Sequence, residues 1–79
     1  MITVRYFAGA RAAAGTATEQ VPAGSLGELL TGLIERHGDP LGRVLGAASF
    51  LVDGVAAHER HAALPPGCTV DVLPPFAGG

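Results

Sequence analysis

The chain has 79 residues, of which 48% are hydrophobic and 15% charged, with a formal net charge of -2 at pH 7. This length suits a single domain, because two domains would each be too small to sustain a core. Mild acidity and an aromatic content of 5% argue against nucleic-acid binding, which selects basic faces and stacking rings. All basic residues are arginines, so the sequence lacks the lysine of a P-loop or a Schiff-base mechanism.

No apolar stretch reaches the length of a membrane span, because arginine, glutamate and glycine residues interrupt each one. The first residues do not combine a basic region, an apolar core and a cleavage site, as a signal peptide would. The single cysteine, Cys68, fits a reducing compartment. We therefore expect a cytoplasmic protein that binds neither membrane nor nucleic acid.

The first part of the chain predicts a hairpin. Residues 2–7 are rich in β-branched and aromatic residues and indicate a strand. Residues 9–15 are alanine-rich between glycines and favour a short helix or turn, and residues 16–21 favour a second strand paired with the first. The first strand has two alternating faces, one with Ile2, Val4 and Tyr6 and the other with Thr3, Arg5 and Phe7. This alternation does not decide which face is buried.

The main helix is predicted to begin after Ser25. The Ser25 hydroxyl can cap the helix, and Glu28 can reach back to complete a capping box. His37 and Gly38 close the helix as helix ends usually close. The apolar residues follow helical spacing and form one stripe that must lie on a sheet: Leu26, Leu29, Leu30, Leu33 and Ile34.

The second half predicts strands separated by turns. Residues 40–45 favour one more helical turn, and residues 48–52 form a short apolar run that ends in Asp53-Gly54, a tight hairpin turn with a return strand after it. Residues 58–67 indicate a loop, and residues 69–73 the last strand, with Val70 and Val72 on one face. First and last strands can pair in the sheet centre.

This order of elements predicts an α+β fold of the β-grasp, ubiquitin-like type, in which a small mixed sheet packs on one main helix. Residues 1–74 are expected to form the domain, and residues 75–79 a flexible C-terminal tail ending in Gly-Gly.

The tail carries the argument for function. Pro74 and Pro75 lack backbone donors, so they end the sheet and stiffen the exit. Ala77, Gly78 and Gly79 carry almost no side chain and can thread a narrow channel. The terminal carboxylate, with a reference pKa of about 3.5, is ionised and can attack the α-phosphate of a nucleotide. The alternative is a frayed terminus, where glycine also collects.

Several short motifs together carry a resemblance to a known family: residues 4–8, Arg11 with residues 14–16, residues 25–30, residues 52–54 and, above all, residues 73–79. Through them the sequence resembles the MoaD and ThiS family of ubiquitin-like sulfur carriers over essentially its whole length. The proline pair before the double glycine favours the molybdopterin synthase branch of that family. Two places depart from the family pattern: Gly67-Cys68 stands where Gly-Asp is usual, and Asp53-Gly54 where Asn-Gly is frequent.

The resemblance implies the small subunit of molybdopterin synthase, working through Gly79. An E1-like (MoeB-like) adenylyltransferase would use ATP to adenylate the Gly79 carboxylate, and persulfide sulfur from a sulfurtransferase would displace AMP and leave a thiocarboxylate. The loaded tail, threaded through Ala77 and Gly78, would enter the MoaE-like large subunit. Sulfur would then pass to a cyclic pyranopterin to build the molybdopterin dithiolene. The chain itself would be a non-catalytic subunit with no bound cofactor or metal.

Docking of such partners needs exposed apolar residues near the tail. Phe76 lies past the last strand and is expected to anchor a partner, so Phe76→Ala should weaken a complex but hardly change stability. Phe7 and Leu73 could equally belong to the core, and Arg11 could be an ordinary solvated charge. The partner-binding candidates are Phe7, Arg11, Val55, Leu73, Pro75 and Phe76.

Other polar residues receive structural interpretations. His58 and His61 lie in a predicted loop without a third nearby ligand, so we expect no metal there. Cys68 has no basic neighbour to lower its pKa and is expected to be a small, partly buried apolar residue. Asp53 and Asp71 are interpreted as turn or edge charges.

Two rival functions use the same Gly79. One is a sulfur carrier for cysteine or thiamine biosynthesis. The other is a ubiquitin-like modifier joined through Gly79 to lysines of target proteins.

Overall fold

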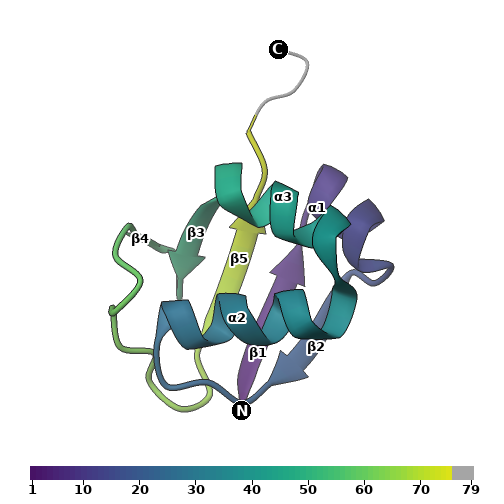
Figure 1. Ribbon diagram of the computed structural model, residues 1–79. Coiled ribbons are helices and arrows are strands. Elements are labelled where there is room, and N and C mark those ends of the chain that lie inside the picture. The colour runs from purple at the N-terminus through teal and green to yellow at the C-terminus, as the bar shows by residue number, and fades with distance from the viewer. Residues whose placement is uncertain (76–79) are drawn as a thin grey trace.

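The computed structural model describes residues 1–75 and shows a mixed sheet with helices on one side (Figure 1). The predicted order of strands and helices is confirmed, including the short return strand after the hairpin turn. In chain order the elements are β1 (Ile2–Tyr6), α1 (Ala8–Ala14), β2 (Thr18–Val21), α2 (Leu26–His37), α3 (Asp39–Ala47), β3 (Ser49–Val52), β4 (Val55–Ala57) and β5 (Thr69–Leu73).

The sheet has the strand order β2-β1-β5-β3-β4. The first and last strands pair at its centre, as predicted, and they run parallel, with Val4 opposite Val70 and Tyr6 opposite Val72. The other neighbours are antiparallel. Because β1 and β5 are parallel, both end at the edge of the sheet opposite the N-terminus (Figure 1).

Helix α2 follows the predicted cap and stripe. The Ser25 hydroxyl accepts a hydrogen bond from the Glu28 backbone N–H at 3.2 Å. Glu28 reaches back one residue further than a standard capping box, because its Oε1 accepts from the Gly24 N–H at 3.2 Å. The four leucines of the stripe are buried, whereas Ile34 is 36% exposed and lies against Gly42 of α3.

Helix α3 is longer than the single turn predicted for residues 40–45. Its nine residues begin after Gly38, whose φ of +84° breaks the path from α2, and Pro40 occupies the first turn. Leu41 and Leu45 lie one turn apart and are both buried. Burial of this pair stabilises a helix that the short apolar pattern alone did not specify.

The core lies between the helices and one face of the sheet. On β1 the buried set is Ile2, Val4 and Tyr6, which settles the ambiguity that the sequence left. Val70 and Val72 of β5 are completely buried on the same side. The members of the core from the helices and connections are Ala10, Leu26, Leu29, Leu30, Leu33, Leu41, Leu45, Leu64 and Cys68.

The predicted hairpin turn at Asp53-Gly54 is confirmed. Both residues have positive φ, +48° and +84°, as a two-residue turn between twisted strands requires. The Asp53 carboxylate also accepts the backbone N–H of Thr69 at 2.9 Å, which ties the turn to the start of β5.

In the described part of the chain, none of the helices combines the length and the apolar character needed to cross a membrane.

Candidate functional site

The candidate site lies where the central strands end. The β5 strand stops at Leu73, which is partly buried, and the chain continues through Pro74 and the exposed Pro75. A proline nitrogen has no hydrogen to donate, so the strand ladder cannot extend through this pair. The predicted site residues Phe76, Ala77, Gly78 and Gly79 lie outside the described residues.

Phe7 marks the same edge from the neighbouring strand. It follows β1 directly, its side chain is 39% exposed, and its backbone N–H donates to the Val72 carbonyl at 3.3 Å. Tyr6, the residue before it, is in register with Val72, so Phe7 lies beside Leu73. The sequence left open whether Phe7 belongs to the core or is exposed, and the structure shows that it is exposed.

The other interface candidates are more scattered. Arg11 is exposed on α1, the helix that follows Phe7, and borders a shallow hollow with Ala8 and Thr16. Val55 is 70% exposed, but it pairs with Val52, which is in register with Val70 near the start of β5. The structure therefore brings Phe7 and Leu73 together and places Val55 away from them.

An ion pair on the open face of the sheet was missed by the sequence reasoning, which interpreted Asp71 as a turn or edge charge. That interpretation is wrong, because Asp71 lies on the central strand β5, in register with Arg5, and is only 8% exposed. Arg5 Nε donates to Oδ1 at 2.6 Å and Nη2 donates to Oδ2 at 2.9 Å. The Asp71 hydrogen bond and charge raise the pKa of Arg5.

This pair also contacts the exposed ring near the tail. The guanidinium carbon of Arg5 lies 5.5 Å from the centroid of the Phe7 ring, within the range of a cation–π contact. The sequence did contain a signal for the ion pair between Arg5 and Asp71. Once the first and last strands are paired in parallel, an arginine and an aspartate on their alternating faces fall opposite each other.

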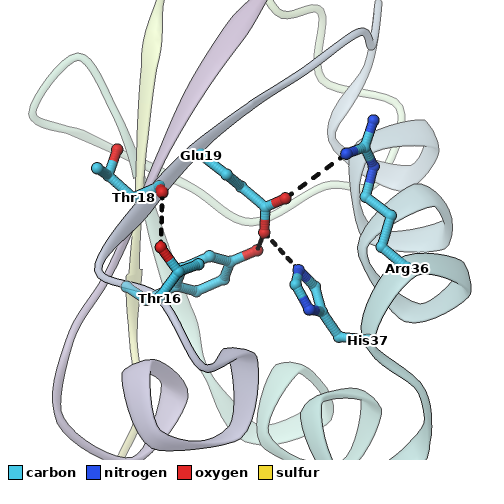
Figure 2. A network of polar contacts seen from close by, with 6 residues as sticks. Thr16, Thr18, Glu19, Arg36 and His37 are labelled. Atoms are coloured by element: carbon cyan, nitrogen blue, oxygen red, sulfur yellow. Dashed lines mark hydrogen bonds and ion pairs between the residues drawn. The ribbon is translucent and has the colours of Figure 1, made fainter.

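A second polar cluster lies on the helix side, at the edge strand β2 (Figure 2). Glu19 accepts hydrogen bonds from the Tyr6 hydroxyl at 2.6 Å and from His37 Nε2 at 2.5 Å, and Arg36 lies 3.7 Å from its other oxygen. Burial, and then the Glu19 carboxylate, raise the pKa of Tyr6. This cluster joins β2 to the end of α2, and we assign it to stability.

The remaining titratable candidates show no site chemistry. Cys68 is buried, as expected, and burial followed by the charge of Asp53 raises the pKa of its thiol. His58 and His61 are exposed, and His61 pairs with Glu59 at 2.8 Å. Within residues 1–75, no three His, Cys, Asp or Glu side chains converge as a metal site would require.

Taken together, a helix-covered mixed sheet with a parallel central pair, from which the chain departs at Pro74, defines a ubiquitin-like β-grasp domain. The sequence matches the model of the ThiS family over residues 4–79. The chain belongs to this family of ubiquitin-like sulfur carriers and modifiers.

Solved structures with this fold cover nearly the whole chain. SAMP1 from Haloferax volcanii is 26% identical, covers 99% of this chain and 98% of its own, and gives a TM-score of 0.85. A proposed molybdopterin converting factor subunit 1 from Pyrococcus furiosus is 27% identical, with 95% and 97% covered and a TM-score of 0.80. Subunit 1 of the factor from Helicobacter pylori, solved in complex with subunit 2, is 24% identical, with 99% and 97% covered and a TM-score of 0.74. A comparison with curated protein sequences finds no match.

Proposed function

We propose that the chain is a cytoplasmic sulfur carrier that acts as the small subunit of molybdopterin synthase. The observation that carries the proposal is the Gly78-Gly79 pair. It comes a few residues after the central strand β5 of a ThiS-family domain. The proline pair at 74–75 and the likeness to the Pyrococcus furiosus protein favour the molybdopterin branch.

The chemistry falls on the Gly79 carboxylate. One of its oxygens attacks the α-phosphate of ATP on an activating enzyme, which forms an acyl adenylate and releases pyrophosphate. The terminal sulfur of a persulfide from a sulfurtransferase then attacks the acyl carbon and expels AMP, leaving an acyl disulfide. A thiol reductant cleaves the sulfur–sulfur bond and frees the thiocarboxylate at Gly79. Adenylation is needed because a carboxylate is a poor acyl donor, whereas sulfur is the stronger nucleophile.

The loaded end then acts as a sulfur donor in the large subunit. Ala77 and Gly78 present little bulk, so the tail can enter a narrow site there. Sulfur passes to a cyclic pyranopterin, and hydrolysis of the acyl–sulfur bond returns Gly79 to a carboxylate. The domain supplies the docking surface, and the activating enzyme uses the ATP.

The test is to express the chain in its own host with an N-terminal tag, in wild-type form and with Gly79 deleted. Intact-mass measurement should find wild-type molecules heavier by the difference between a sulfur and an oxygen atom. The deletion should abolish that species and molybdenum-cofactor activity. Thermal unfolding is the control and should be unchanged, because the described core lies within residues 2–72. A functional Gly79-deleted strain would contradict the proposal.

A protein modifier is the second candidate, favoured by the likeness to SAMP1, a small archaeal modifier protein. A modifier function predicts higher-mass conjugates in the wild type. These conjugates would disappear in the Gly79-deleted strain, whereas the molybdenum cofactor would persist. Auxotrophy for cysteine or thiamine in that strain would instead identify a carrier for one of those pathways.

A further inference from the structure

The end of the tail offers an activating enzyme very little to recognise. Ala77, Gly78 and Gly79 lack side chains beyond a methyl group, so contacts to them cannot distinguish this carrier from another with the same end. Discrimination must therefore come from side chains before residue 77, and those of the described residues closest to the tail lie on the folded domain. Arg5, Phe7 and Leu73 lie there, on the two central strands.

Arg5 is held in a fixed orientation at this place. Its Nε and Nη2 are bound to Asp71, and the Phe7 ring lies beside the guanidinium. The side chain is nevertheless 53% exposed, against 11% for that of Asp71. Among residues 1–75, Nη1 of Arg5 has no hydrogen-bond acceptor. A guanidinium fixed in advance loses less side-chain entropy when a partner binds it.

A protein that covers this face must compensate the exposed part of the charge. Asp71 is already shielded by Arg5, so the loss of water falls mainly on the guanidinium. A buried donor left without an acceptor weakens binding, and a carboxylate is the strongest acceptor for arginine. The surface chemistry that fits Arg5 is therefore an acidic side chain, next to an apolar contact for Phe7.

We propose that Arg5 is the residue by which the ATP-dependent activating enzyme selects this carrier, through an acidic side chain of that enzyme that pairs with Nη1, and that Asp71 positions Arg5 for it. This inference rests on the proposed function, because it concerns the step that loads Gly79.

A charge swap separates recognition from a merely structural role. Arg5→Glu, Asp71→Arg and the double variant are expressed in the host, and the fraction of thiocarboxylate is measured by intact mass. Arg43→Glu is the matched control, since Arg43 is exposed on α3, on the other side of the sheet. Arg5→Gln removes the charge without placing two carboxylates together, and urea unfolding reports whether each variant is folded.

We expect each single variant on this pair to lower the loaded fraction by about tenfold or more, as for other charges lost from an interface. The double variant should recover the unfolding free energy of the wild type but not its loading, and Arg43→Glu should load normally.

Recovery of loading by the double variant would overturn the inference, because the pair would then be structural. Normal loading of a folded Arg5→Gln variant would also overturn the inference. If that variant loaded normally but the cofactor were lost, the large subunit, and not the activating enzyme, would be the protein that recognises Arg5. An unloaded wild type would refute the proposed function itself, and with it this inference.

Discussion

Replacing Glu19 by glutamine tests whether the cluster at β2 stabilises the fold through charge. The change preserves the shape of the side chain and one oxygen that can accept from Tyr6 or His37. It removes the negative charge that strengthens both hydrogen bonds and attracts Arg36. The site is well shielded, because Tyr6 is 3% exposed and the Glu19 side chain 16%.

The expected loss follows from these contacts. Two charge-assisted hydrogen bonds become neutral ones, and the ion pair with Arg36 at 3.7 Å is weak, so the free energy of unfolding should fall by about 1–2 kcal/mol. With an m-value of about 1 kcal/mol/M for a small protein, the urea midpoint should fall by about 1–2 M. Glu35→Gln, an equal change at an exposed position of α2, is the control and should leave the midpoint nearly unchanged.

The pH dependence of folding stability provides a second test of the role of Glu19. Burial alone would raise the pKa of Glu19, but the hydrogen bonds from Tyr6 and His37 and the charges of His37 and Arg36 outweigh burial and hold it below its ordinary value of 4.5. A carboxylate whose pKa is lower in the folded state stabilises fully above its unfolded pKa and loses that effect as pH falls through the folded value.

The stability gap between wild type and Glu19→Gln should therefore be present at neutral pH and shrink below about pH 4.5. Urea titrations at several pH values measure this gap. An undiminished gap in acid, or no gap at neutral pH, would refute the argument that the charge of Glu19 carries the stabilisation.

Two backbone positions give further predictions, each with a control of opposite sign. Ala8 has a φ of +49°, a conformation that a residue with a Cβ disfavours, so Ala8→Gly should raise the unfolding free energy by about 0.5 kcal/mol. Ala12→Gly inside α1 is the control and should lower the unfolding free energy by about the same amount. A Cβ on Gly27 would lie 3.1 Å from the Arg60 carbonyl, so Gly27→Ala should destabilise by about 1–2 kcal/mol. Gly32→Ala in the same helix meets only Val21 at 3.8 Å and should stabilise by up to about 1 kcal/mol. Urea unfolding measures all four variants, and equal signs within either pair would contradict the geometry.

Where local chemistry and burial agree, the fold could be predicted from the sequence. Ser25 and Glu28 cap the helix whose leucines form a single stripe, and the structure buries that stripe on the sheet. Asp53-Gly54 supports positive φ at two successive residues, which a two-residue hairpin turn needs. In these segments each residue preference points to the same conformation.

Other features depend on tertiary contacts and could not be predicted in this way. The alternation in β1 defines two faces, and only the position of the helices decides that Phe7 is exposed while Tyr6 is buried. The full length of α3 follows from burial of Leu41 and Leu45 on a helix that packs against α1 and α2. Nothing in the local sequence marks Glu19, because its partner His37 comes from the end of α2, which only the tertiary fold places beside it.

Asp71 shows how the topology connects fold and function. A charged residue two positions before the end of the last strand has the sequence signature of an edge, yet the parallel pairing of β1 and β5 puts it in the sheet centre, opposite Arg5. The same pairing brings the ends of both strands to one edge, so Phe7, Leu73 and the start of the tail meet there. One crossover thus places a fixed cation and an exposed ring beside the point where the chain leaves the sheet. An antiparallel centre would have put the end of β5 beside the start of β1, and the tail would have left the sheet at the opposite edge from Phe7.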